Sequence, residues 1–226
     1  MTKQIIAQGA EAIIYLEKDT ITKHRISKPY RHPELDKKII KRRTKSETKL
    51  LKKASEFVNA PYPEDQKDIN KIVMPFIDGL KLSEHLDSFK QTKQEKIMFE
   101  LGKSIGKLHK EHIIHGDLTT SNIIFIPNKR NSNNSSNMGR MEGERSAGGR
   151  DKIFLMDFGL GYFNGKYEDK AVDIHLLKQA LEAKHFKNWE TLFNEFEIGY
   201  RLIEPTEAEK VFDRMKVIEK RGRYKD

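Results

Sequence analysis

The stretch His115-Gly116-Asp117-Leu118-Thr119-Thr120-Ser121-Asn122 carries an acid and an amide directly before the apolar run Ile123-Ile124-Phe125-Ile126. A second apolar run, residues 153–156, ends at Asp157-Phe158-Gly159. Two short apolar runs of this kind predict a β-hairpin. Pairing them would bring Asn122, before the first strand, beside Asp157, after the second.

Side chains of these types, in this order, are typical of phosphoryl transfer. In the kinase arrangement, a catalytic-loop Asp accepts the proton of the attacking hydroxyl, a following Asn binds one metal ion, and a later Asp holds the metal ion that bridges the phosphates. The corresponding residues are Asp117, Asn122 and Asp157. Because Mg²⁺ prefers few carboxylate ligands together with phosphate oxygens and water, the sequence predicts ATP with Mg²⁺, and Asn122 and Asp157 as metal ligands. Either motif alone reads equally well as an ordinary turn, but the two together favour the catalytic interpretation.

Composition limits the remaining possibilities. With 226 residues, 36% hydrophobic and 34% charged, the chain can form one large domain or two small lobes that share a cleft. Its net charge of +9 indicates attraction to polyanions. The absence of cysteine excludes disulfides and thiolate metal sites. Without a signal-peptide core or a span of about 20 apolar residues, we expect no membrane attachment and a cytoplasmic or nuclear location.

Strands and one long helix are expected in the first third of the chain. The predicted elements are a hairpin of residues 4–16 and 20–25, a helix over residues 34–57 and a strand over residues 71–77. The predicted inward positions of the helix are Leu35, Ile39, Thr44, Leu50 and Leu51.

Helices dominate the rest of the chain. They are predicted at residues 82–86, 93–111, 173–183, 189–202 and 206–220, and the second has a buried stripe at Ile97, Leu101, Ile105 and Leu108. The fold class is therefore α+β, a minimal kinase-like arrangement with an N-lobe (1–77) and a C-lobe (78–226) around a nucleotide. Residues 128–150, rich in Asn, Ser, Gly, Arg and Glu, are expected to form a disordered insert.

A metal site alone does not position ATP, so a cation for the phosphates and an acid to hold that cation are also expected. Lys23, on the second strand, and Glu47, the single acid between Asp36 and Glu56, fit these roles. Lys18, Arg25 and Lys28 are rivals of Lys23. A surface ion pair of Glu47 with Arg43, one turn earlier, remains an alternative.

The nucleotide is expected under the N-terminal strands. The segment from Gly9 through Ala10 and Glu11 to Ala12 would cover the phosphates with its backbone amides, and Glu11 would orient Lys23 or the long helix, although a single Gly is a weak signal. The adenine would lie against the connector after Met74, bound by the backbone of Phe76 and Ile77. Its two faces would contact Ile14 and Ile124.

Several longer motifs resemble the small atypical kinase subunits of the KEOPS (EKC) complex, which are related to the p53-related protein kinase. They are Gln8–Ala12, Lys23-His24-Arg25, Tyr30–Asp36, Arg42-Arg43-Thr44 with Glu47, His115–Asn122, Asp157–Leu160, Glu168–Asp173 and Arg221-Gly222-Arg223. The resemblance covers nearly the whole chain apart from the insert. It implies the roles given above for Lys23, Glu47, Asp117, Asn122 and Asp157, and it implies that Asp173 anchors the catalytic loop.

Departures from ordinary protein kinases refine the predicted chemistry. Gly116 stands where they usually have Arg, so no cation would clamp a phosphorylated loop, and Thr119 stands where they usually have Lys. The segment from Asp157 to Asp173 is short and lacks Ala-Pro-Glu, which leaves little room for a peptide-docking platform. ATP hydrolysis with water as acceptor is therefore as plausible as phosphorylation of Ser or Thr in a protein.

The resemblance also implies partners: other KEOPS subunits, among them a tRNA threonylcarbamoyltransferase, and a role in forming threonylcarbamoyladenosine on tRNA. Positive charge recurs on the long helix (Lys38, Arg42, Lys45, Lys49, Lys52) and in a tail over residues 214–225. A solvated basic face explains the helix set better than tRNA contact does, whereas the tail is expected to contact RNA or the active-site mouth of the partner. Two other readings stay open. One is a small-molecule phosphotransferase, and the other is a pseudokinase scaffold, against which the complete set of metal and base residues speaks.

Overall fold

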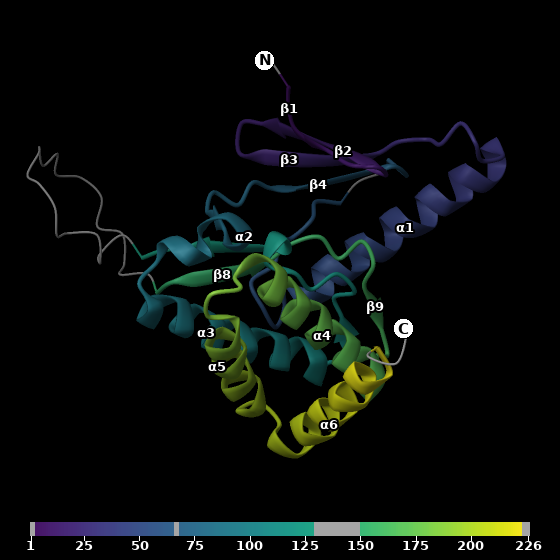
Figure 1. Ribbon diagram of the computed structural model, residues 1–226. Coiled ribbons are helices and arrows are strands. Elements are labelled where there is room, and N and C mark those ends of the chain that lie inside the picture. The colour runs from purple at the N-terminus through teal and green to yellow at the C-terminus, as the bar shows by residue number, and fades with distance from the viewer. Residues whose placement is uncertain (1–2, 66–67, 129–149, 223–226) are drawn as a thin grey trace, which may run out of the picture.

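The computed structural model describes residues 3–65, 68–128 and 150–222. Figure 1 shows a β-sheet at one end of the molecule and helices at the other, with α1 running obliquely between them. The strands are β1 (Gln4–Gln8), β2 (Ala12–Glu17), β3 (Thr20–Arg25), β4 (Lys71–Pro75), β5 (Leu80–Lys81), β6 (Ile113–Ile114), β7 (Ile123–Ile126), β8 (Lys152–Leu155) and β9 (Tyr162–Phe163). The helices are α1 (Pro33–Ala54), α2 (Leu82–His85), α3 (Gln91–Lys110), α4 (Tyr167–Lys184), α5 (Trp189–Arg201) and α6 (Pro205–Gly222).

The N-terminal sheet has the order β1-β2-β3-β4, with all neighbours antiparallel. The prediction of a single strand over residues 4–16 is wrong, because the chain turns at residues 9–11, where the Gly9 amide donates to the carbonyl of Ala12 at 2.9 Å. Alternation of apolar residues continues on both sides of this turn and conceals it. The structure thus has a tight turn at the place where the sequence predicts a phosphate-covering segment.

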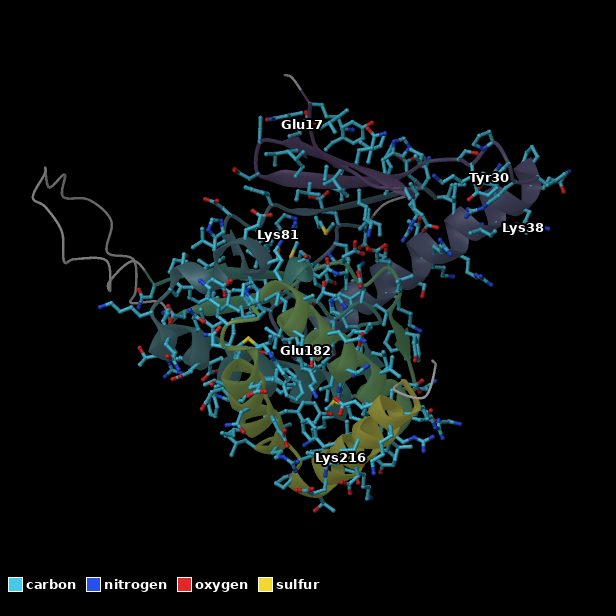
Figure 2. All side chains as sticks on the ribbon, viewed as in Figure 1. Glu17, Tyr30, Lys38, Lys81, Glu182 and Lys216 are labelled. Atoms are coloured by element: carbon cyan, nitrogen blue, oxygen red, sulfur yellow. The ribbon has the colours of Figure 1, made fainter. Side chains whose placement is uncertain are left out.

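Helix α1 buries a mixed face. Its buried positions include Asp36, Ile40, Thr44 and Glu47, followed by Leu50, Leu51 and Ala54. The predicted inward position of Leu35 is wrong, since this side chain is 53% exposed, and the burial of Ile40 exceeds that of Ile39. The predicted inward positions Thr44, Leu50 and Leu51 are buried. The apolar pattern did not select Asp36, whose carboxylate accepts hydrogen bonds from Ser27 and Arg31. Figure 2 shows Lys38 extending away from the body at the outer end of α1.

The predicted hairpin is confirmed. Strand β7 pairs antiparallel with β8, with Ile123 opposite Leu155 and Ile126 opposite Lys152, and β5 adds a third strand beside β7. The Met156 amide donates to the carbonyl of Asn122 at 2.9 Å, which holds the two ends of the hairpin together. Of the predicted insert, residues 129–149 lie outside the described residues.

The helical end packs around α3. Its predicted stripe is confirmed, because Leu101, Ile105 and Leu108 are fully buried and Ile97 is 2% exposed. Two glycines let α3 and α5 approach closely: a Cβ atom on Gly102 would lie 2.0 Å from the carbonyl oxygen of Phe196, and one on Gly199 would lie 2.0 Å from that of Phe99. Close backbone contact of this kind fixes α5 against α3, the helix that precedes β6 and the catalytic loop.

One cluster of buried apolar side chains includes residues of both ends of the molecule, such as Leu50 and Ile72 with Leu82 and Leu101. The division into lobes at residue 77 therefore stays a prediction. Within the described ranges, no helix is both long and apolar enough to cross a membrane.

Candidate active site

The catalytic loop follows β6 and ends in a 3₁₀ turn, Thr120–Asn122, before β7. Asp173 of α4 anchors it, since its carboxylate accepts the amide of His115 at 2.7 Å and that of Gly116 at 2.9 Å. His109 of α3 contacts the same carboxylate at 3.2 Å. Burial raises the pKa of Asp173, but the hydrogen bonds from His109 and His115 outweigh it, so the pKa lies below its usual value. The implied anchoring role of Asp173 is confirmed by this geometry.

His115 connects the catalytic loop to the end of β8, a role that was not predicted. Its Nε2 contacts the carbonyl of Met156 at 2.9 Å, and its Nδ1 accepts the amide of Asp117 at 3.3 Å. These partners assign the proton to Nε2 in a neutral ring. The ring also packs on Phe158, with centroids 4.6 Å apart. The His115 side chain is fully buried. The sequence signal for this link was its place at the start of the His115-Gly116-Asp117 motif.

Asp117 and Asn122 lie at the two ends of the loop and are joined directly. The Asn122 Nδ2 donates to the Asp117 carbonyl at 2.9 Å and to its Oδ2 at 2.8 Å. Because both contacts use Nδ2, the Asn122 side-chain oxygen is turned away from Asp117. That orientation fits a neutral oxygen ligand for a cation.

Asp157 follows β8 with φ of 56°, a left-handed conformation that Asp tolerates better than most residues. Its Oδ1 accepts the Lys23 ammonium at 2.6 Å and the Gly159 amide at 3.1 Å. Burial raises the pKa of Asp157, but the charge of Lys23 and these hydrogen bonds have the larger effect. The pKa therefore lies below its usual value, and the group stays ionised. One carboxylate and one amide oxygen suit Mg²⁺ that keeps phosphate and water ligands, and the described residues contain no cluster of three acids or histidines that would hold a metal by itself.

Lys23 lies between two acids. Its Nζ donates to Glu47 Oε1 at 2.7 Å as well as to Asp157, and its side chain is 9% exposed. Burial lowers the pKa of Lys23, but Glu47 and Asp157 raise it above its usual value. The pKa of Glu47 lies above its usual value, because the effect of burial exceeds the opposing effect of Lys23 and Arg25. The predicted pair is confirmed as a contact, and the alternative pair of Glu47 with Arg43 is wrong.

Arg43 instead binds Glu11, in the turn between β1 and β2. The pKa of Glu11 lies below its usual value, chiefly because of the Arg43 hydrogen bond. Lys28 donates to the Ala10 carbonyl in the same turn. Glu11 therefore orients the long helix, one of its two predicted roles, and has no contact with Lys23 among the described interactions.

Lys23, Asp117 and Asp157 line one cavity of about 520 Å³. Its lining residues are Ala7, Gln8, Gly9, Glu11, Ala12, Ile14, Lys23, Arg25, Arg43, Asp117, Asp157, Gly159 and Leu160. The phosphate segment, Lys23, Asp117 and Asp157 thus converge as predicted from residues far apart in sequence. Met74, Phe76, Ile77 and Ile124, predicted around the adenine, are not in the lining.

One prediction about the connector after Met74, that the backbone amide of Phe76 binds the adenine, is wrong. The amide of Phe76 donates to the Asp19 carbonyl at 2.7 Å, so it is not available to a base. The carbonyl of Phe76 and the amide of Ile77 remain as the groups by which this segment would contact the adenine. Sequence could not foresee this loss, because it depends on the register of β4 against β3, in which Pro75 lies opposite Thr20.

The segment after Asp157 passes directly over the catalytic loop. Gly116 has φ of 81°, and a Cβ atom there would lie 2.3 Å from the Leu160 carbonyl oxygen. The chain then forms β9 and enters α4 at Tyr167, so no peptide platform intervenes. The missing Arg at position 116 thus has a steric cause, since main chain fills its place.

We expect Gly116→Ala to lower the free energy of unfolding by about 2–3 kcal/mol, because a left-handed residue would gain a side chain in contact with backbone. Thermal unfolding measures the effect. Gly9→Ala is the matched control, since the nearest atom to its added Cβ would be 3.8 Å away, an ordinary contact. Equal melting temperatures for the two variants would contradict the prediction.

Comparisons with known proteins agree with this geometry. Residues 13–131 match the RIO domain family. The KEOPS complex subunit Bud32 of Pyrococcus abyssi is 38% identical, and the alignment covers 99% of this chain and 97% of that protein. A probable bifunctional tRNA threonylcarbamoyladenosine biosynthesis protein of Methanosarcina mazei is 34% identical, over 98% of this chain but only 36% of that protein.

A solved structure supports the fold. The Rio2 kinase of Chaetomium thermophilum, in a complex described as ADP/Mg²⁺-phosphoaspartate, matches with a TM-score of 0.59 and 14% identity. The match covers 96% of this chain and 70% of that one. At this identity the likeness shows a kinase-like fold, as predicted from the sequence.

Proposed function

Since the chain belongs to the family of KEOPS complex subunit Bud32, atypical kinases with a RIO domain, we propose that its cavity binds ATP with Mg²⁺ and transfers the terminal phosphoryl group, chiefly to water. Membership of this family assigns the chain to tRNA threonylcarbamoyladenosine biosynthesis. The observation that carries the catalytic proposal is the position of Lys23 between Glu47 and Asp157, in a cavity shared with Asp117.

Each side chain has a role in this proposal. Asp157 and Asn122 would hold Mg²⁺, which when bound neutralises charge on the phosphates. Lys23, held by Glu47, would turn from Asp157 to the phosphate oxygens. Asp117 would accept a proton from the attacking water, and its hydrogen bond from Asn122 keeps the carboxylate in place.

Water is favoured as acceptor for two reasons. The segment from Asp157 to α4 is short, and its backbone at Leu160 packs on Gly116 of the catalytic loop. Thr119 supplies no charge to orient a protein hydroxyl. Phosphorylation of Ser or Thr in a protein remains a secondary activity in this proposal. The paired site residues argue against a pseudokinase scaffold.

We also propose a threonylcarbamoyltransferase subunit as partner and tRNA as ligand of the basic surface. The exposed cations of α1 support tRNA contact more than the tail does. Arg214 and Arg221 at the end of α6 both pair with Glu168, and residues 223–226 lie outside the described part of the chain. Residues 214–222, predicted as a tail, belong to a helix.

ATP turnover by the purified chain tests the function, with and without tRNA and the transferase subunit. We expect Lys23→Ala to reduce turnover by about 100-fold, because the phosphates lose their cation. Lys110→Ala, which removes an exposed Lys of the helical end, is the control and should match the wild type. A melting curve confirms that each variant is folded. Undiminished turnover of folded Lys23→Ala would refute the assignment.

A further inference from the structure

Arg25 is a second buried cation beside the predicted phosphate site. Residues of β3 alternate in burial, so that Ile21, Lys23 and Arg25 share the face towards α1. Arg25 is 5% exposed, even less than Lys23 at 7%. A guanidinium is seldom buried so fully unless its partners require it.

Glu47 is shared between the two cations. Its Oε1 accepts Lys23, and its Oε2 accepts Arg25 Nη2 at 2.5 Å. With one charged donor on each oxygen, the carboxylate is held in a single orientation. Lys23 alone would leave it free to rotate about its last torsion, which has a broad energy minimum.

Arg25 also faces the turn of residues 9–11. Its Nη1 lies 3.7 Å from Glu11 Oε2, the oxygen that Arg43 of α1 binds. Arg25 stands opposite Ala12 in the β2–β3 pair, and the next amide, of Ile26, donates to the Glu11 carbonyl at 3.1 Å. The guanidinium thus lies between the turn and the helix that carries Glu47.

We propose that Arg25 is a positioning residue for the phosphate site: it fixes Glu47 for Lys23 and, through Glu11, joins the turn of residues 9–11 to α1. The inference deepens the proposed function and rests on it. A Cβ atom built on Gly159 would lie 3.5 Å from Lys23 Nζ and 3.6 Å from Arg25 Nη2, so both cations end beside the Asp157 turn. In this proposal Lys23 binds the phosphates, while Arg25 acts by holding Glu47 and Glu11.

Hydrogen exchange of the nucleotide-free protein tests the link. We expect Arg25→Gln to speed exchange of the Ile26 and Gly9 amides by about tenfold, because the turn loses its link to Glu47 of α1 through Arg25 and keeps only the link from Glu11 to Arg43. Arg25→Lys, which keeps the charge, should restore part of the protection. Arg201→Gln is the matched control, since it removes an ion-paired guanidinium from the helical end. Unchanged exchange in Arg25→Gln would overturn the inference.

Nucleotide binding and turnover separate positioning from stability. We expect Arg25→Gln to lower kcat by about tenfold or more and to weaken binding of a fluorescent ATP analogue only severalfold, with recovery in Arg25→Lys. A wild-type kcat in folded Arg25→Gln overturns the inference and leaves the proposed function intact. Failure of the wild type to bind the analogue overturns both. If Arg25→Gln does not fold, Glu11→Gln removes the links of the turn to both Arg25 and Arg43, and Arg43→Gln removes the second link alone, so equal exchange in these two variants overturns the inference.

Discussion

Asp157→Asn should reduce ATP turnover by about 1,000-fold while the protein stays folded. Asn tolerates the left-handed backbone at this position and keeps an acceptor for the Gly159 amide. The substitution removes only the negative charge that would hold Mg²⁺ and that pairs with Lys23. The fall should therefore appear in kcat, together with a higher Mg²⁺ requirement, and steady-state turnover over a Mg²⁺ series measures both.

The other end of the same hairpin provides the control. Asp151 also accepts a lysine, Lys93, and a backbone amide, that of Asn128, but lies away from the cavity. Asp151→Asn therefore removes an equivalent carboxylate charge, and we expect turnover within about twofold of the wild type. If the two variants lost activity equally, Asp157 would have no special role.

Asp173→Ala should cost about 3–5 kcal/mol of stability, because it leaves two backbone amides and His109 without their acceptor in the interior. For a chain of this size that corresponds to a fall in melting temperature of roughly 6–20 °C. Activity should fall as well, since the amides of His115 and Gly116 set the position of Asp117. Thermal unfolding and ATP turnover measure the two effects.

The pH dependence has a definite sign. Because the pKa of Asp173 is lower in the folded protein than in the unfolded chain, its stabilisation is complete above the unfolded value of about 4 and is lost as the pH falls through the folded value. The difference between the wild type and Asp173→Asn should therefore shrink in acid. Asp213→Ala, in an exposed pair with Lys216, is the control and should change stability by less than about 0.5 kcal/mol. A constant difference down to acid pH would contradict this account.

The sequence predicted features that depend on motif order and charge type. The β7–β8 hairpin, the Lys23 and Glu47 pair and the anchoring Asp173 lie where expected. The hairpin follows from two apolar runs and the pair from strand position and charge, whereas the role of Asp173 was implied by the family resemblance. The roles of Asn122 and Asp157 as metal ligands stay predictions: Asp157 lines the cavity, whereas Asn122 is not in its lining and contacts it through Asp117.

Features that depend on tertiary contact were missed. The turn at residues 9–11 lies within continuous apolar alternation, and the inward face of α1 includes Asp36, which an apolar pattern does not select. Arg25 looked like one of several cations near Lys23, and only the approach of β3 to α1 shows that it shares Glu47. Whether a charged side chain is buried depends on partners from other parts of the chain, which a local sequence pattern does not show.

The contact between Gly116 and Leu160 limits how this protein could evolve. A regulated kinase would need an arginine at position 116, yet any side chain there meets the backbone of the following segment. No single codon change could therefore install a phosphorylation switch, since the segment after Asp157 would have to be rebuilt at the same time. The close approach of Leu160 to Gly116 therefore closes this route to phosphate-triggered control.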